Sequence, residues 1–159
     1  GMIPIISYNY GAQRPDRMKR TMKLGVMVGC SIMLFCLVIM QAFPGQILKI
    51  FDATDDMLSM GIPAVRIMST AFIFAGFSVT CSGMFQAVGK GVYSMIVSMA
   101  RQLFVILPVA YFLSKAMNSV NGVWTAFPIA EIFSVIISTF LLLRVYKKIV
   151  KPLERGQIE

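Results

Sequence analysis

The sequence has no histidine, only seven acidic residues and just three cysteines in 159 positions. Cys30, Cys36 and Cys81 form no Cys-x-x-Cys spacing, and each lies in an uncharged apolar segment. We therefore predict no metal site and no disulfide, because cysteines in such surroundings behave as small apolar residues. The sequence also contains no Gly-rich phosphate loop, no nucleophile beside a partner base and no acid pair at catalytic spacing. We expect no catalytic residue and no enzymatic activity.

Apolar residues, in contrast, make up 57% of the sequence, while charged residues make up 14%. These proportions, with a mean hydropathy of +0.76, lie outside the usual range of soluble domains and predict a protein in a lipid bilayer. The net charge of +8 includes fifteen basic residues, ten of which lie before residue 24 or after residue 143. Because these ten flank apolar segments, they favour a role in membrane topology over a nucleic-acid surface, and we expect no nucleic-acid partner.

Four long apolar segments are candidates for membrane-spanning helices. They cover residues 24–43, 67–89, 93–113 and 122–143. Each has about 20 residues, which at about 1.5 Å per residue crosses a hydrocarbon core about 30 Å thick. Gly61-Ile62-Pro63 predicts the start of the second helix, with the proline in its first turn. Pro108 predicts a kink in the third, because proline removes a helical hydrogen bond.

Basic residues are concentrated in alternate connections between these segments. Five precede the first segment (Arg14, Arg17, Lys19, Arg20 and Lys23), Lys90 follows the second, and five follow the fourth (Arg144, Lys147, Lys148, Lys151 and Arg155). By the positive-inside rule, these connections and the C-terminus are cytoplasmic. The sequence thus predicts the end of a preceding transmembrane helix at 1–12, a basic cytoplasmic loop at 13–23, a four-helix transmembrane region at 24–146 and a cytoplasmic basic tail at 147–159.

Polar residues inside the predicted spans are the candidates for function. Ser78, Ser82 and Gln86 lie in the second span, where their face either lines an aqueous cavity or packs on a neighbouring helix through hydrogen bonds. Arg101 lies about 12 Å along the third helix from Tyr93. Its long side chain is expected to snorkel to the cytoplasmic surface or to form a structural ion pair, with direct substrate contact as the alternative.

Glu131 is the only acidic residue inside a predicted span. It lies nine residues after Gly122, which places it about 14 Å below the outer end of its helix and near the middle of the membrane. A charge there costs at least ~2.5 kcal/mol unless it is paired, hydrated or protonated. One hypothesis is a structural ion pair with Arg101, whose predicted depth is similar. The other is a cavity-facing carboxylate that binds a cationic substrate or carries a coupling ion.

Four groups of residues carry a family resemblance. They are Gly1, Pro4 and the Tyr8-Asn9-Tyr10-Gly11-Ala12 run with Arg17; the Gln86-Ala87-Val88-Gly89-Lys90 turn; Arg101-Gln102 with Pro108; and Gly122-x-Trp124 with Pro128 and Glu131. In this order, along nearly the whole chain, they resemble motifs of the multidrug and toxic compound extrusion (MATE) transporters. The resemblance implies an all-α membrane protein and a twelve-helix transporter built from two six-helix lobes. This chain would supply four transmembrane helices of one lobe and the end of the helix before them.

The same resemblance implies the function. Members of the family export drug-like, often cationic compounds in exchange for protons or sodium ions, and need no cofactor. The expected partners are the lipid bilayer, the remaining helices of the transporter and small-molecule drugs, and the expected location is a bacterial inner membrane. Some members use acidic residues of this lobe for sodium, including one on the helix that the second span resembles. That span has no acidic residue here, so proton coupling is at least as well supported.

Two alternatives remain at this point. A lipid-linked oligosaccharide flippase of the same superfamily would be expected to place more charged residues on its cavity than Arg101 and Glu131. A non-transporting four-helix assembly module would be expected to form a complete, stable chain. The apolar residues Ile3, Ile5 and Ile6 instead predict the last turns of a helix that begins before Gly1.

Overall fold

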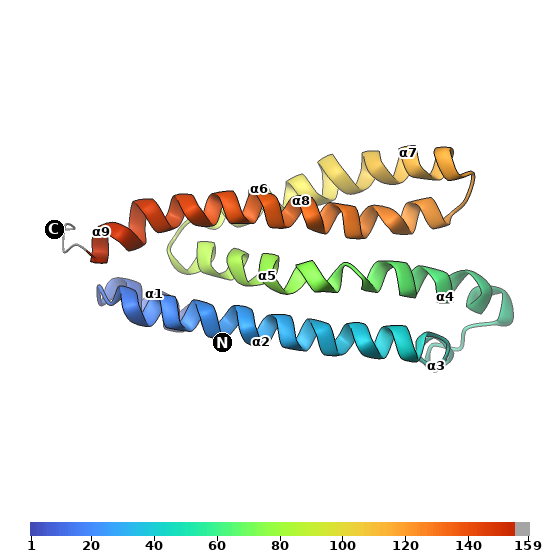
Figure 1. The fold of residues 1–159 in the computed structure, drawn as a ribbon, viewed down its shortest axis with the longest axis horizontal. Coiled ribbons are helices and arrows are strands. Elements are labelled where there is room, and N and C mark those ends of the chain that lie inside the picture. Colours follow the sequence, from blue (N-terminus) through green and yellow to red (C-terminus); the bar gives the residue numbers. More distant parts are fainter. Residues whose placement is uncertain (155–159) are drawn as a thin grey trace.

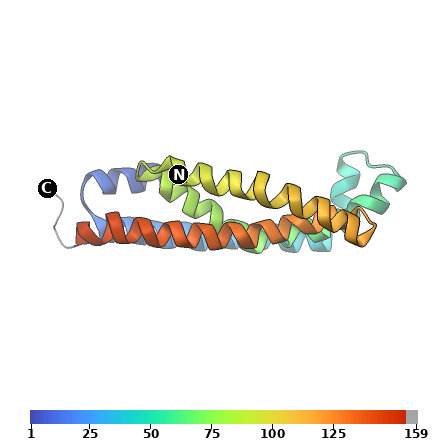
Figure 2. The same cartoon turned by 90° about the horizontal axis from the view of Figure 1, so that it is seen from above.

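The computed structural model describes residues 1–154, in which every regular element is a helix. The elements are α1 (Met2–Gly11), α2 (Pro15–Ala42), α3 (Pro44–Ile50), α4 (Asp55–Ser69), α5 (Phe72–Ala87), α6 (Gly91–Met99), the π-helical segment η1 (Ala100–Ile106), α7 (Leu107–Met117), α8 (Asn121–Val145), the π-helical segment η2 (Tyr146–Val150) and α9 (Lys151–Glu154). The long helices run lengthwise, with α5 packed between α2 and α8 (Figure 1). Seen from above, the short helix α3 and the loop after it project sideways from one end of the bundle (Figure 2).

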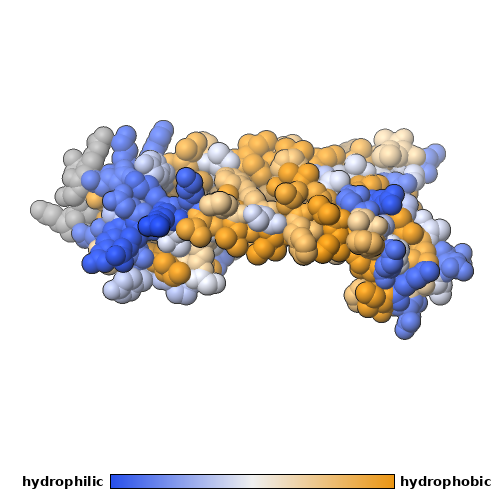
Figure 3. Space-filling view, turned by 60° about the horizontal axis from the view of Figure 1, so that its bottom comes forward, coloured by the Kyte–Doolittle hydropathy of each residue, from blue (hydrophilic) through white to orange (hydrophobic). Residues whose placement is uncertain are grey.

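The four predicted spans correspond to long helices. Three continuous helices are long and apolar enough to cross a membrane: Pro15–Ala42 with 28 residues, Gly91–Met117 with 27 and Asn121–Glu154 with 34. The second predicted span corresponds to α4 together with α5, which are bent by 54° at a short break. On the face in Figure 3, hydrophobic residues cover the middle of the bundle and hydrophilic residues gather at its two ends. This distribution is that of an all-α membrane protein.

The second span differs from the expectation in its start and its continuity. Thr54 caps α4 by accepting a hydrogen bond from the Met57 amide at 3.4 Å, so the helix begins at Asp55 and Pro63 lies in its interior. The helix then breaks after Ser69. The Ser69 and Thr70 hydroxyls donate to the carbonyl oxygens three residues earlier, and such side-chain hydrogen bonds compete with the helical ladder. The continuous span predicted over 67–89 is therefore wrong.

The third span is one continuous helix through Pro108 that contains a π-helical segment, and the kink at Pro108 stays a prediction. The seven residues of η1 immediately precede α7, and Pro108 lies in the first turn of α7. A proline has no amide hydrogen and its ring crowds the carbonyl four residues earlier, so a wider π-helical turn before it accommodates both effects. Arg101 lies in this segment, which sets the direction of its side chain.

Both basic segments at the chain ends are more ordered than expected. Pro15 begins α2, so most of the predicted loop at 13–23 is helix. The predicted tail at 147–159 is helical as far as Glu154, and Ile149, Val150 and Leu153 are buried in the core. These apolar side chains can be covered only if the segment stays helical against the bundle, where Lys19 contacts Glu154 at 2.5 Å. Arg155 lies outside the described residues.

The contact between α2 and α5 depends on small residues. A Cβ atom added to Gly76 would lie 3.0 Å from both the Cα and the amide nitrogen of Cys30, and one added to Gly29 would lie 3.1 Å from the Thr80 hydroxyl. Since lipid offers no hydrophobic driving force between helices, such close backbone packing is what holds membrane helices together. This interface therefore fixes α5, whose opposite face forms the candidate site.

Candidate functional site

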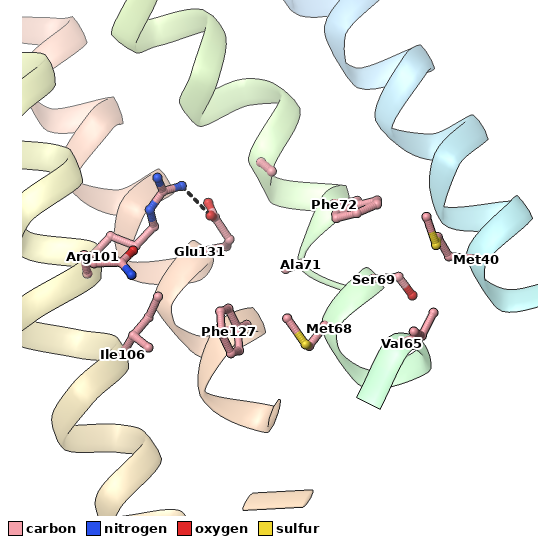
Figure 4. A pocket seen from close by; sticks show the side chains of 12 residues that line it. Met40, Val65, Met68, Ser69, Ala71, Phe72, Arg101, Ile106, Phe127 and Glu131 are labelled. Atoms are coloured by element: carbon pink, nitrogen blue, oxygen red, sulfur yellow. Dashed lines mark hydrogen bonds and ion pairs between the residues drawn. The ribbon is translucent and has the colours of Figure 1, made fainter. Parts of the chain in front are cut away.

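The Arg101–Glu131 ion pair joins the third and fourth spans. Arg101 extends from η1, and its Nη1 donates to Glu131 Oε1 on α8 at 2.6 Å (Figure 4). The two side chains are only 29% and 10% exposed, respectively. The second carboxylate oxygen, Oε2, is buried and has no hydrogen-bond partner among residues 1–154. The structure thus places the two residues together and leaves one oxygen of the acid unengaged by the described residues.

A cavity of about 400 Å³ lies on one side of the ion pair. Arg101 and Glu131 form one wall, and the broken region of the second span, around Ser69 and Phe72, forms the opposite wall with Met40 of α2 (Figure 4). Gln41 of α2 stabilises the break by donating to the Arg66 carbonyl oxygen at 2.8 Å and to the Ser69 hydroxyl at 3.1 Å. The break in the helix and the ion pair therefore face the same space.

A second cavity, of about 310 Å³, also includes Arg101 in its lining. Ser78, Ser82 and Gln86 all line it, so the structure brings the three polar candidates of the second span together. Gln86 donates to the Ser94 hydroxyl of α6 at 3.1 Å, an interhelical hydrogen bond. The Ser78 hydroxyl is buried and unpartnered within residues 1–154. The face accordingly combines packing at Gln86 with cavity lining at Ser78, and the two hypotheses for this face are not exclusive.

Two further buried serines lie on α8 and were not among the sequence-based candidates. Ser134 and Ser138 are 1% and 0% exposed, and neither hydroxyl has a partner in the described part of the chain. With Glu131 they are spaced by three and four residues, which places them on one face of the helix. That spacing is visible in the sequence and could have identified them. Ser134 also lines the second cavity, beside Ser78 and Arg101.

The chemistry available here is that of a carboxylate in an apolar setting. One oxygen is held by a guanidinium, and the other can accept a proton, a water molecule or a cation. Nearby hydroxyls can donate and accept hydrogen bonds, while the aliphatic and aromatic lining of the larger cavity suits an apolar molecule. Within residues 1–154, no three His, Cys, Asp or Glu side chains are grouped as metal ligands.

Comparisons with known proteins found a family model, a curated relative and solved structures that resemble this chain. The family model MatE matches residues 1–112. A curated relative, multidrug export protein MepA of Staphylococcus saprophyticus, is 26% identical over 125 residues, which are 79% of this chain and 27% of the relative. Among solved structures, the MATE multidrug transporter DinF-BH, solved as a complex, is 31% identical with a TM-score of 0.81, covering 94% of this chain and 33% of that protein.

A second structure has the same fold at lower identity. It is an inward-facing multidrug resistance MATE family transporter of the MOP superfamily, with a TM-score of 0.86 and 18% identity, and the match covers 99% of this chain and 36% of that one. The chain therefore spans between about a quarter and about a third of the length of these relatives. With a family match over most of its residues, the chain belongs to the MatE family of multi-pass membrane transporters, which are not enzymes.

Proposed function

We propose that this chain forms four transmembrane helices of one lobe of a multidrug efflux antiporter in a bacterial inner membrane. The transporter would export drug-like, often cationic compounds in exchange for protons or sodium ions. Family membership and the relatives named for multidrug export support this function. The single observation in this chain that supports it best is the buried Arg101–Glu131 pair beside an apolar cavity.

Glu131 is the proposed coupling residue. Its Oε2 atom is buried beside the cavity and is not engaged by any described residue, so it can take a proton or meet a cation. The second span carries no acidic residue from Ile67 to Gly89, which leaves Glu131 as the membrane-embedded acid of this chain. Arg101 would then serve two purposes, since it lowers the cost of the buried charge and competes with an incoming cation for the same carboxylate.

The test is Glu131→Gln in the complete transporter, measured as ion-dependent efflux of the cationic dye ethidium from cells. Glutamine keeps the shape and removes the charge, so we expect export to fall at least tenfold with membrane expression unchanged. Asp55→Asn, an exposed acid in the first turn of α4, is the matched control and should leave efflux unchanged. Unaltered efflux across pH in Glu131→Gln would remove Glu131 from the mechanism.

The proposed topology places the two ends of the bundle on opposite sides of the membrane. Arg17 and Lys148 lie at one end, and Asp55 and Asn118 at the other, as the helix order in Figure 1 indicates. The basic end would be cytoplasmic by the positive-inside rule. Single cysteines in a cysteine-free background test this assignment. An impermeant thiol reagent added outside should label positions 55 and 118 but neither 17 nor 148, and the reverse pattern would overturn it.

We also propose that these 159 residues need the remaining helices of the transporter for activity. A cavity that opens alternately to the two sides of a membrane requires two parts that move against each other. Cells that make only this chain should therefore show no ethidium efflux above background, while cells that also supply the missing helices should. Ion-dependent efflux by the chain alone would contradict the proposal that it is part of a lobe.

A further inference from the structure

A groove with a volume of about 580 Å³ lies between the start of α2 and the end of α8, away from the ion pair. Its α2 wall includes Met22, Val26 and Met27, its α8 wall includes Leu142 and Leu143, and Met84 of α5 also contributes to it. Met27 and Leu143 are 56% and 54% exposed, so the groove opens to the side of the bundle. Figure 3 shows that apolar surface continues from the middle of the molecule towards the hydrophilic end on the face that it displays.

Two basic residues line one end of the groove. Lys19 and Lys23 lie four residues apart, hence on one face of α2, and the apolar residues Met22, Val26 and Met27 continue the lining further along the helix. Other basic residues belong to the same end of the molecule: Arg14 directly before α2, Arg17 and Arg20 in α2, and Arg144, Lys147, Lys148 and Lys151 near the end of the described chain. Two described acids of this end, Asp16 and Glu154, both contact Lys19, at 3.2 and 2.5 Å.

Lys23 contacts no carboxylate among residues 1–154. The groove therefore has a cationic group without a counter-ion from the described chain at one end and apolar side chains along its length. That order matches an amphiphile whose negative head lies at the membrane surface and whose hydrocarbon chain points towards the bilayer centre. A cationic drug fits poorly beside Lys23, because the two positive charges would repel each other.

We propose that this groove binds an anionic phospholipid, with the phosphate at Lys23 and one acyl chain against Met22, Val26, Met84 and Leu142. Basic residues between membrane helices recognise anionic head groups, and apolar burial retains the chain. The groove differs from the cavity beside Arg101 and Glu131 in position, and its Lys23 has no carboxylate partner among the described residues. It goes beyond the proposed export function and does not depend on it.

The test uses the complete transporter in vesicles that contain equal amounts of photoactivatable phosphatidylglycerol and phosphatidylcholine. After illumination, mass spectrometry of the peptide that contains residues 18–27 measures cross-linking to each lipid. We expect phosphatidylglycerol to be cross-linked about fivefold more than phosphatidylcholine, and Lys23→Gln to remove most of that preference. Arg20→Gln, which makes the same charge change on the same helix but outside the groove lining, should retain it.

A second pair of variants separates the groove from general surface charge. Leu143→Trp narrows the groove from an exposed wall and should lower phosphatidylglycerol cross-linking at residues 18–27 severalfold. Val28→Trp, also at an exposed position but outside the lining, should leave it unchanged. Equal labelling by both lipids, loss of the preference in Arg20→Gln, or cross-links from this peptide to another helix of the transporter in place of lipid would each overturn the proposal.

Discussion

The two faces of α5 pack in opposite ways. Towards α2, the glycines at positions 29 and 76 let the backbones approach until an added Cβ would meet main-chain atoms of Cys30 at 3.0 Å. Towards α8, buried hydroxyls at Ser78, Ser134 and Ser138 have no partners among the described residues, and Ser78 and Ser134 line a cavity of about 310 Å³. One interface is closed and the other retains space and unsatisfied polar atoms.

We expect the α2 interface of α5 to contribute mainly to stability and its α8 interface to contribute mainly to function. Close packing of small residues supplies the attraction that holds helices together in lipid, so the α2 interface is best suited to be fixed. Unsatisfied buried polar groups cost free energy, and they persist where another demand maintains them. Under the proposed function, the α8 interface is where a ligand or water would bind and where the helices would rearrange.

The largest expected effect on the free energy of unfolding tests whether the Arg101–Glu131 ion pair is structural. Arg101→Gln leaves the Glu131 carboxylate buried without its partner and should lower the free energy of unfolding by about 3 kcal/mol. Adding Glu131→Gln should recover most of this loss, measured by denaturant titration of the complete transporter in micelles. Lys115→Gln, at the exposed end of the same span, is the control and should change stability little.

The outcome of that double-mutant cycle also tests the role of the carboxylate in export. Strong coupling in stability supports a structural ion pair. Additive stabilities combined with lost export in Glu131→Gln would instead favour the cavity-facing role, because export would then depend on the acid and not on its partner.

The next largest effect on stability is expected at the α2–α5 interface. Gly76→Ala should lower the free energy of unfolding by about 1–3 kcal/mol, because the new methyl group meets backbone atoms of Cys30 that can move only if α2 shifts. Gly91→Ala is the matched control, since nothing lies within 4 Å of its added Cβ. Equal stability of the two variants, in the same denaturant titration, would mean that the α2–α5 contact is looser than its geometry indicates.

The smallest effect on stability is expected at the buried serines between α5 and α8. Ser134→Ala removes a buried hydroxyl that has no partner in residues 1–154, so stability should stay constant or rise by less than about 1 kcal/mol, while ethidium export falls. Thr139→Val on the same helix is the control, because Thr139 is exposed and donates to the Val135 carbonyl oxygen. A loss of stability in Ser134→Ala with normal export would assign Ser134 to packing alone.

Much of the candidate site could be predicted from the sequence, but its details could not. The estimated depths of Arg101 and Glu131 made an ion pair one of two hypotheses, and the structure puts their side chains 2.6 Å apart. The break at Ser69 was missed because it depends on side-chain hydrogen bonds, including those from Gln41 on another helix. The basic residues predict a tail at 147–159, whereas the burial of Ile149, Val150 and Leu153 depends on packing against the bundle that the local sequence does not show.

Apolar segments of about 20 residues and the charges that flank them are enough to predict that this chain lies in a membrane. Which polar residues share a cavity depends instead on how the helices pack. Arg101 and Glu131 are thirty positions apart, and whether they meet depends on the rotation of each helix about its axis and on the extra width of η1. Those rotations are set by packing against α5, whose own position depends on glycine contacts with α2 and cannot be read from the periodicity of a single helix.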